Sequence, residues 1–101
     1  MSEFLKIGDY QLENLFQKNV RFTYLNLGTE TTHPLLKGSE LTTPESAVEK
    51  ILGMNLPDHA PIVLICENGS KSVSVAKQLG DKGFINVIVV DGGVAALSPK
   101  T

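Results

Sequence analysis

The pattern of apolar and polar positions predicts alternating helices and strands along the chain. Apolar residues recur at helical spacing after Asp9, which can cap a helix that ends near Lys18. The apolar face of this helix consists of Leu12, Leu15 and Phe16. Residues 21–27 are a short run with aromatic and β-branched side chains, which predicts a strand. From Gly28 to Thr42 the pattern has no sustained period, which predicts a long connecting loop.

A second helix is predicted to begin at Pro44, after Thr43, because proline gives up only an N–H that the first helical turn leaves unpaired. Its apolar face consists of Ala47, Val48, Ile51 and Leu52. Gly53 is predicted to end this helix in a left-handed conformation.

Two later runs, residues 60–66 and 85–91, are almost continuously apolar, which is typical of strands buried on both faces. Between them, helical spacing of Val73, Ala76 and Leu79 predicts a third helix, whose polar face consists of Ser74, Lys77, Gln78, Asp81 and Lys82. Gly83 suits a left-handed residue after this helix, with Phe84 contacting Leu79. A helical turn is expected over residues 94–97, followed by a fraying end.

The element order predicts an α/β fold: a small parallel β-sheet with helices on both faces, in a single domain spanning residues 1–101. The chain has 9 Lys and Arg against 11 Asp and Glu, without a basic stripe, so nucleic acid is not an expected partner. The N-terminal residues fit neither a signal peptide nor a membrane span, so we expect a cytoplasmic protein. No metal-ligand spacing is present, and no cofactor is expected.

Cys66, the single cysteine, ends the apolar run of residues 60–66. The polar residues that follow it are Glu67, Asn68, Gly69, Ser70, Lys71 and Ser72. In open parallel sheets, ligands bind beyond the carboxyl ends of the strands, so we expect a site in this loop. Backbone N–H groups without helix or strand partners can converge there on an anion. Together with the positive charge of Lys71, these N–H groups favour the thiolate form of Cys66; the ordinary pKa of a cysteine thiol is about 8.5.

The remaining loop residues have distinct expected roles. Gly69 lets the backbone turn inward, and the hydroxyls of Ser70 and Ser72 can donate to the sulfur or to a bound oxyanion, or cap the helix. Glu67 is expected to face solvent, because an inward carboxylate would oppose a thiolate.

This loop resembles the active-site loop of the rhodanese family of sulfurtransferases, in which Cys is followed by two variable residues, Gly, one variable residue, Arg and Ser. Cys66, Gly69 and Ser72 match this form, with Lys71 where the family often has Arg. The stretch "AKQLGDKGFINVIVVDGGVAAL" is similar to the family sequence that follows the loop. Three positions depart from the family: Asn26 and Gly28 replace an Asp and an Arg, and Leu97 replaces a tryptophan.

The resemblance implies a rhodanese-like fold and transfer of a sulfane sulfur. In such a reaction Cys66 takes the outer sulfur of thiosulfate or a persulfide, holds it as a persulfide, and passes it to a thiol or cyanide, or to a sulfur-carrier protein. The single cysteine suits this scheme. The resemblance leaves the physiological donor and acceptor and the oligomeric state open.

Other interpretations of Cys66 remain. It can be a small apolar residue that ends a buried strand, or part of a non-catalytic rhodanese-like module that binds a partner or senses oxidants. A phosphatase is disfavoured because Lys71 comes too early for that loop and lacks the fork of arginine. An arsenate reductase with an internal disulfide relay needs a second cysteine. His33 and His59 are expected in packing or surface roles, with His59 at the sheet edge opposite the site.

Overall fold

The computed structural model describes residues 4–18, 22–27, 38–67 and 70–91. In this part of the chain the strands are β1 (Leu5–Ile7), β2 (Thr23–Leu27), β3 (Glu40–Thr42), β4 (Ile62–Ile65) and β5 (Val87–Val90). The helices are α1 (Asp9–Gln17), α2 (Pro44–Gly53) and α3 (Ser70–Asp81). The predicted turn over residues 94–97 and the fraying end lie outside the described residues.

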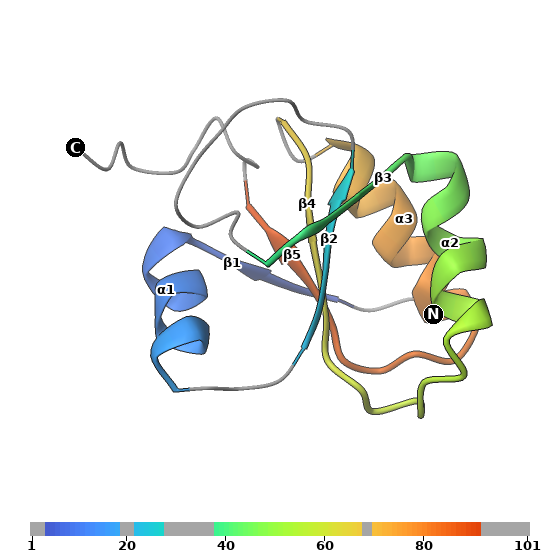
Figure 1. Ribbon diagram of the computed structural model, residues 1–101, viewed down its shortest axis with the longest axis horizontal. Helices are drawn as coiled ribbons and strands as arrows, with labels where there is room; N and C mark the ends of the chain where they lie inside the picture. The colour runs from blue at the N-terminus through green and yellow to red at the C-terminus, as the bar shows by residue number, and fades with distance from the viewer. Residues whose placement is uncertain (1–3, 19–21, 28–37, 68–69, 92–101) are drawn as a thin grey trace.

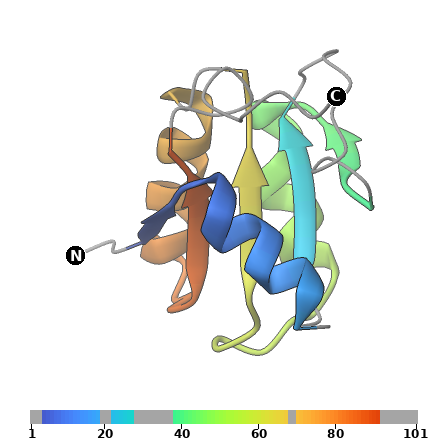
Figure 2. The same ribbon diagram turned by 90° about the vertical axis from the view of Figure 1, so that its left-hand side faces the viewer.

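The strands form one parallel sheet in the order β1-β5-β4-β2-β3. α1 covers one face of this sheet, and α2 and α3 cover the other (Figure 1). Seen from the α1 side, the central strands end at the top of the molecule (Figure 2). The predicted α/β fold with a parallel sheet and helices on both faces is therefore confirmed.

The core is divided into two layers by the sheet, because successive side chains of a strand point to opposite faces. In β4, Ile62 and Leu64 pack on the α2 and α3 side, whereas Val63 and Ile65 pack on the α1 side. All four side chains are fully buried. The layer under α2 and α3 includes Ala47 and Ile51 of α2, and Val75, Ala76 and Leu79 of α3. The apolar pattern of β4 is continuous because helices cover both faces of the sheet.

The ends of the first two helices each differ from the prediction at one residue. The N-cap of α1 is Gly8, whose N–H donates to Gln11 Oε1 at 2.6 Å, so the predicted cap at Asp9 is wrong. The cap of α2 is confirmed: Thr43 Oγ1 accepts from the N–H of Ser46 at 3.2 Å. Its left-handed residue, however, is Asn55, at φ 54°, and Gly53 is helical.

The third helix ends as predicted. Gly83 has φ 101°, its N–H donates to the carbonyl of Gly80, and the N–H of Phe84 donates to the carbonyl of Leu79. This pair of hydrogen bonds is the Schellman motif, which satisfies carbonyls at a helix end. Phe84 is buried in the same layer as Leu79.

Two strands were not predicted from the pattern. β1 lies before the first predicted helix, where no element was expected, and β3 lies at the end of the expected loop from Gly28 to Thr42. Both are three-residue edge strands, and the described residues before β3 begin at Gly38. Leu52 also differs from the prediction, because its side chain is exposed on α2.

Candidate active site

Cys66 directly follows β4 at the carboxyl end of the sheet, where the sequence predicted it. Its side chain is buried, with 1% of its surface exposed. By the alternation of the strand it joins Ile62 and Leu64 in the layer under α2 and α3, which also contains Val75. The cysteine is therefore both the end of a buried strand and a residue at the ligand-binding edge of an open parallel sheet.

The loop residues divide into exposed and buried groups. Glu67 is exposed, as expected, and Ser70 and Lys71 are exposed in the first turn of α3. Ser72 is fully buried, and its Oγ has no hydrogen-bond partner among the residues that the structure describes. Asn68 and Gly69 lie outside those residues. A buried hydroxyl without a partner is energetically unfavourable and unusual in folded proteins, and a bound group that accepted a hydrogen bond from it would remove this cost.

The N-terminus of α3, at Ser70, comes four residues after Cys66 in the chain. The twelve residues of α3 have no acid in the first turn, where acids are usually favoured, and Lys71 is there instead. The positive end of the helix dipole and the Lys71 ammonium therefore act in the same direction on an anion near this turn.

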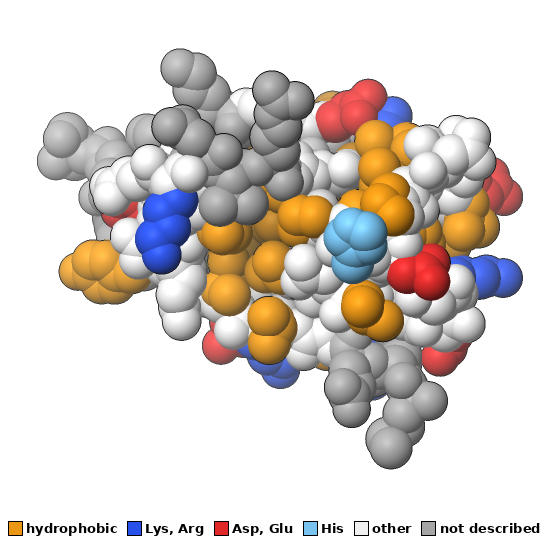
Figure 3. Space-filling model, turned by 90° about the horizontal axis from the view of Figure 1, so that it is seen from below, with side chains coloured by type: hydrophobic (Ala, Val, Ile, Leu, Met, Phe, Trp, Pro, Cys, Tyr) orange, Lys and Arg blue, Asp and Glu red, His pale blue; other side chains and the backbone are white. Residues whose placement is uncertain are grey.

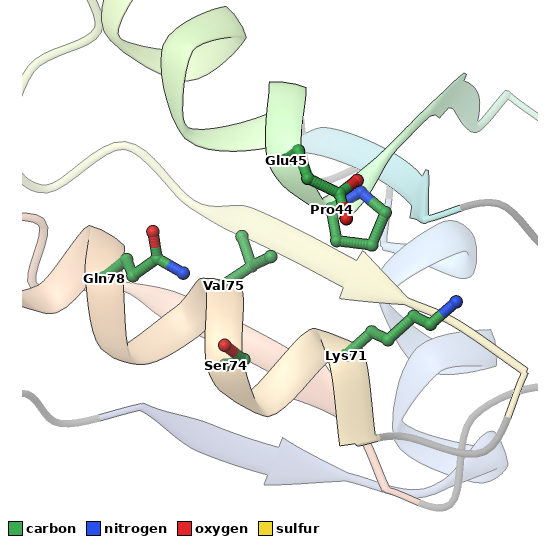
Figure 4. A pocket seen from close by; sticks show the side chains of 6 residues that line it. All are labelled: Pro44, Glu45, Lys71, Ser74, Val75 and Gln78. Carbon is green, nitrogen blue, oxygen red and sulfur yellow. The ribbon is translucent and has the colours of Figure 1, made fainter.

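A cavity of about 390 Å³ lies beside this turn, between α2 and α3 (Figure 4). Its lining residues come from the two helices: Pro44, Glu45, Lys71, Ser74, Val75 and Gln78. Of the described loop residues, only Lys71 lines it. The Lys71 side chain extends past the end of β4, away from Ser74 and Gln78 (Figure 4).

Sequence reasoning missed the cavity. Ser74 and Gln78 were assigned correctly to the exposed face of α3, and both are exposed. Lys71, Ser74 and Gln78 follow the three- and four-residue spacing of one helix face, which is the signal that was available. The packing of α2 against this face brings Glu45 to the cavity. This packing of two helices has no local sequence signal.

Of the other singled-out residues, two are described by the structure and three are not. Asn26 is buried in β2 and pairs in register with Ile65, on the strand next to the one that delivers Cys66. Gly28, His33 and Leu97 lie outside the described residues. His59 is exposed in the turn before β4, at the opposite end of the strand from Cys66, as predicted. Figure 3 views that end and shows a histidine among hydrophobic side chains.

Membrane-spanning helices and metal clusters are both absent from the described part of the chain. None of its helices is both long and apolar enough to cross a bilayer. No group of three or more His, Cys, Asp or Glu side chains in this part is arranged to hold a metal ion.

Comparisons with known proteins agree with this geometry. The structure of a rhodanese homologue from the extremely thermophilic bacterium Thermus thermophilus is 25% identical, with a TM-score of 0.68 over 91% of this chain and 99% of that one. A rhodanese-like domain protein from Staphylococcus aureus is 17% identical, with a TM-score of 0.74 over 95% and 93% of the two chains. A NAD-dependent persulfide reductase from A. fulgidus is 21% identical, with a TM-score of 0.66; the match covers 91% of this chain and 15% of that one.

No curated protein matches the sequence. The family model of the rhodanese-like domain, however, matches residues 18–100, which include β2, the Cys66 loop and β5. Because this match spans most of the chain and the parallel sheet agrees with solved rhodanese homologues, the chain belongs to the rhodanese-like domain family.

Proposed function

We propose that this protein is a sulfurtransferase that moves a sulfane sulfur from a donor such as thiosulfate to a thiol or cyanide through a persulfide on Cys66. The observation that supports this most directly is the position of Cys66, between the carboxyl end of β4 and the N-terminus of α3. Family membership adds to it, because the rhodanese family is one of sulfurtransferases.

In the first half of the reaction, the Cys66 thiolate attacks the outer sulfur of thiosulfate. A bond forms between the two sulfur atoms, the sulfur–sulfur bond of thiosulfate breaks, and sulfite leaves with the electron pair. In the second half, an acceptor thiolate attacks the outer sulfur of the persulfide, and Cys66 leaves as a thiolate. No external oxidant or reductant is needed, and one cysteine suffices.

Three features of the loop support anionic chemistry. The dipole of α3 favours negative charge at its N-terminus, and Lys71 adds a positive charge in the first turn. The buried Ser72 Oγ, which lacks a partner among the described residues, offers a donor to a sulfur anion. Glu67, the acid in the described part of the loop, is exposed and does not oppose this charge from within the core.

The burial of Cys66 favours a second candidate function. A side chain that is 1% exposed and packed in an apolar layer also suits a rhodanese-like module that binds a partner without transferring sulfur. In this candidate the thiol is a core residue, and sulfur donors do not reach it.

Mass spectrometry of the intact protein after treatment with thiosulfate separates the two candidates. For the sulfurtransferase we expect a gain of one sulfur atom, about 32 Da per chain, which cyanide removes with release of thiocyanate. The Cys66→Ala variant, which keeps a small apolar side chain in the layer, serves as the control and gains nothing. If the unmodified protein also gains no sulfur from thiosulfate or from a small-molecule persulfide, the non-catalytic module is the better description.

A further inference from the structure

The cavity between α2 and α3 contains two opposite charges that are not paired with each other. Glu45 projects from the first turn of α2, and Lys71 from the first turn of α3 (Figure 4). Within the described part of the chain neither makes an ion pair; the ion pair seen there, Lys50 Nζ to Glu40 Oε1 at 2.7 Å, joins α2 to β3. The cavity is therefore bordered by a carboxylate, and the Lys71 ammonium lies at its end, beyond the tip of β4.

The rest of the lining provides hydrogen-bonding groups and an apolar surface. Ser74 contributes a hydroxyl and Gln78 an amide, and both are exposed. Pro44 and the buried Val75 are apolar. The volume of about 390 Å³ lies in the range of small-ligand sites. A purely anionic ligand would meet Glu45, and a purely cationic one would meet Lys71, so a ligand that carries both charges fits the lining best.

We propose that this cavity binds the thiol that accepts the sulfur, and that this acceptor is a zwitterion, namely cysteine or a short peptide with a cysteine. Its ammonium faces Glu45 and its carboxylate faces Lys71. The inference rests on the proposed function and adds the chemical class of the acceptor.

The cavity is in a suitable place for this role. Val75 lines it and also belongs to the buried layer that contains Cys66. Lys71 is in the first turn of α3, directly after the loop that starts at Cys66. A ligand held between α2 and α3 therefore lies beside the first turn of α3, which follows Cys66 closely in the chain.

The order of the two half-reactions lets Lys71 serve both substrates. Thiosulfate is used and sulfite has left before the acceptor reacts, so the same ammonium can first attract the anionic donor and then the carboxylate of the acceptor. Glu45 has no such double use, because it repels thiosulfate. Its substitution should therefore slow the second half-reaction without slowing the first.

The test measures transfer from a preformed Cys66 persulfide to four thiols of different charge. These are 2-mercaptoethanol (neutral), 3-mercaptopropionate (anionic), cysteamine (cationic) and cysteine (zwitterionic). In Glu45→Gln we expect the second-order rate constants for cysteamine and cysteine to fall about two- to fivefold, the size of one exposed charge contact. Those for 2-mercaptoethanol and 3-mercaptopropionate should not fall, and formation of the persulfide from thiosulfate should not slow.

The control is Glu49→Gln, which removes an exposed acid from the same helix outside the cavity and should change none of the four rates. A second readout needs no transfer: S-methylcysteine, which has both charges but no thiol, should shift the NMR signals of α2 and α3 amides saturably, and more weakly in Glu45→Gln. Equal effects of Glu45→Gln on all four thiols, or no shift at these amides, would overturn the inference. Failure to form the persulfide would instead contradict the proposed function, and the S-methylcysteine titration would still test the cavity.

Discussion

Tyr24 is a residue whose ionisation the fold changes. Its ring lies in an aromatic cluster with Phe16 of α1 and Phe22, with ring centres 5.7–6.0 Å apart. The side chain is 5% exposed. Burial raises the pKa of the Tyr24 hydroxyl above the ordinary value of 10.0, because the charged tyrosinate would lose its hydration.

We expect this pKa shift to make the folded protein less stable in alkali. The folded state holds the Tyr24 proton more tightly than the unfolded state, so its contribution to stability is complete below about pH 10 and is lost as the pH rises from there towards the folded pKa. One such group contributes a slope of up to about 1.4 kcal/mol per pH unit. Urea unfolding between about pH 9 and pH 11 measures it.

The comparison needs two variants, so that the effect of Tyr24 is separated from other effects of alkali on stability. Tyr24→Phe should show a shallower alkaline loss of stability than the unmodified protein. Tyr10→Phe, which removes a tyrosine that is 79% exposed, should leave the slope unchanged. Equal slopes in Tyr24→Phe and the unmodified protein would contradict the prediction.

Among single residues of the candidate site, Cys66 could be predicted from the sequence, whereas the residues that α2 contributes to the cavity could not. Cys66 could be found because strand-end position, residue type and a family loop coincide in one short stretch. The exposure of Glu67 and Lys71 follows from the same local pattern. Glu45 could not be found, because its place beside Lys71 depends on how two helices separated in sequence pack together.

Among the elements, the ends of α2 and α3 look alike in sequence and differ in structure. Both were predicted to end in a left-handed glycine. Gly83 has φ 101°, whereas Gly53 lies within α2 and Asn55 takes the left-handed conformation. Around either glycine no neighbouring atom lies within 4 Å of an added Cβ, so only the backbone conformation distinguishes them.

Alanine substitutions should therefore have opposite effects at the two positions. We expect Gly83→Ala to lower the free energy of unfolding by about 1–2 kcal/mol, the strain of a left-handed residue with a Cβ. Gly53→Ala, its matched control, should raise the free energy by about 0.5–1 kcal/mol, because alanine is the better helix former. Midpoints of urea unfolding measure both. If Gly83→Ala were instead more stable than the unmodified protein, the prediction would be wrong, because alanine should be strained at this φ.

The elements that the sequence did not predict share a physical cause. β1 and β3 have three residues each, and two of the three are exposed in each strand. Such strands carry no sustained apolar alternation, and they form because a neighbouring strand supplies hydrogen-bond partners. The central strands β4 and β5 could be predicted because helices on both sides demand apolar residues at every position.

On the scale of the whole molecule, stability should decrease from the centre of the sheet to its edges. β4 has a partner on each side and four fully buried residues, whereas β1 and β3 have one neighbour each in the described sheet. We expect the backbone amides of β4 to exchange with deuterium only through global unfolding, and those of β3 to exchange at least about tenfold faster through local opening. NMR-detected hydrogen exchange tests this. Protection of β3 equal to that of β4 would mean that the sheet opens as one unit.

The pairing of β1 with β5 also constrains when the protein can fold during its synthesis. Leu5 lies beside Ile88, so the first described strand has its partner in the last one. The layer around Cys66 likewise includes Val87 and Val89 of β5. While the chain is still on the ribosome, Cys66 therefore cannot reach its final packing until β5 has emerged. During that interval cellular oxidants and thiols can reach its thiol.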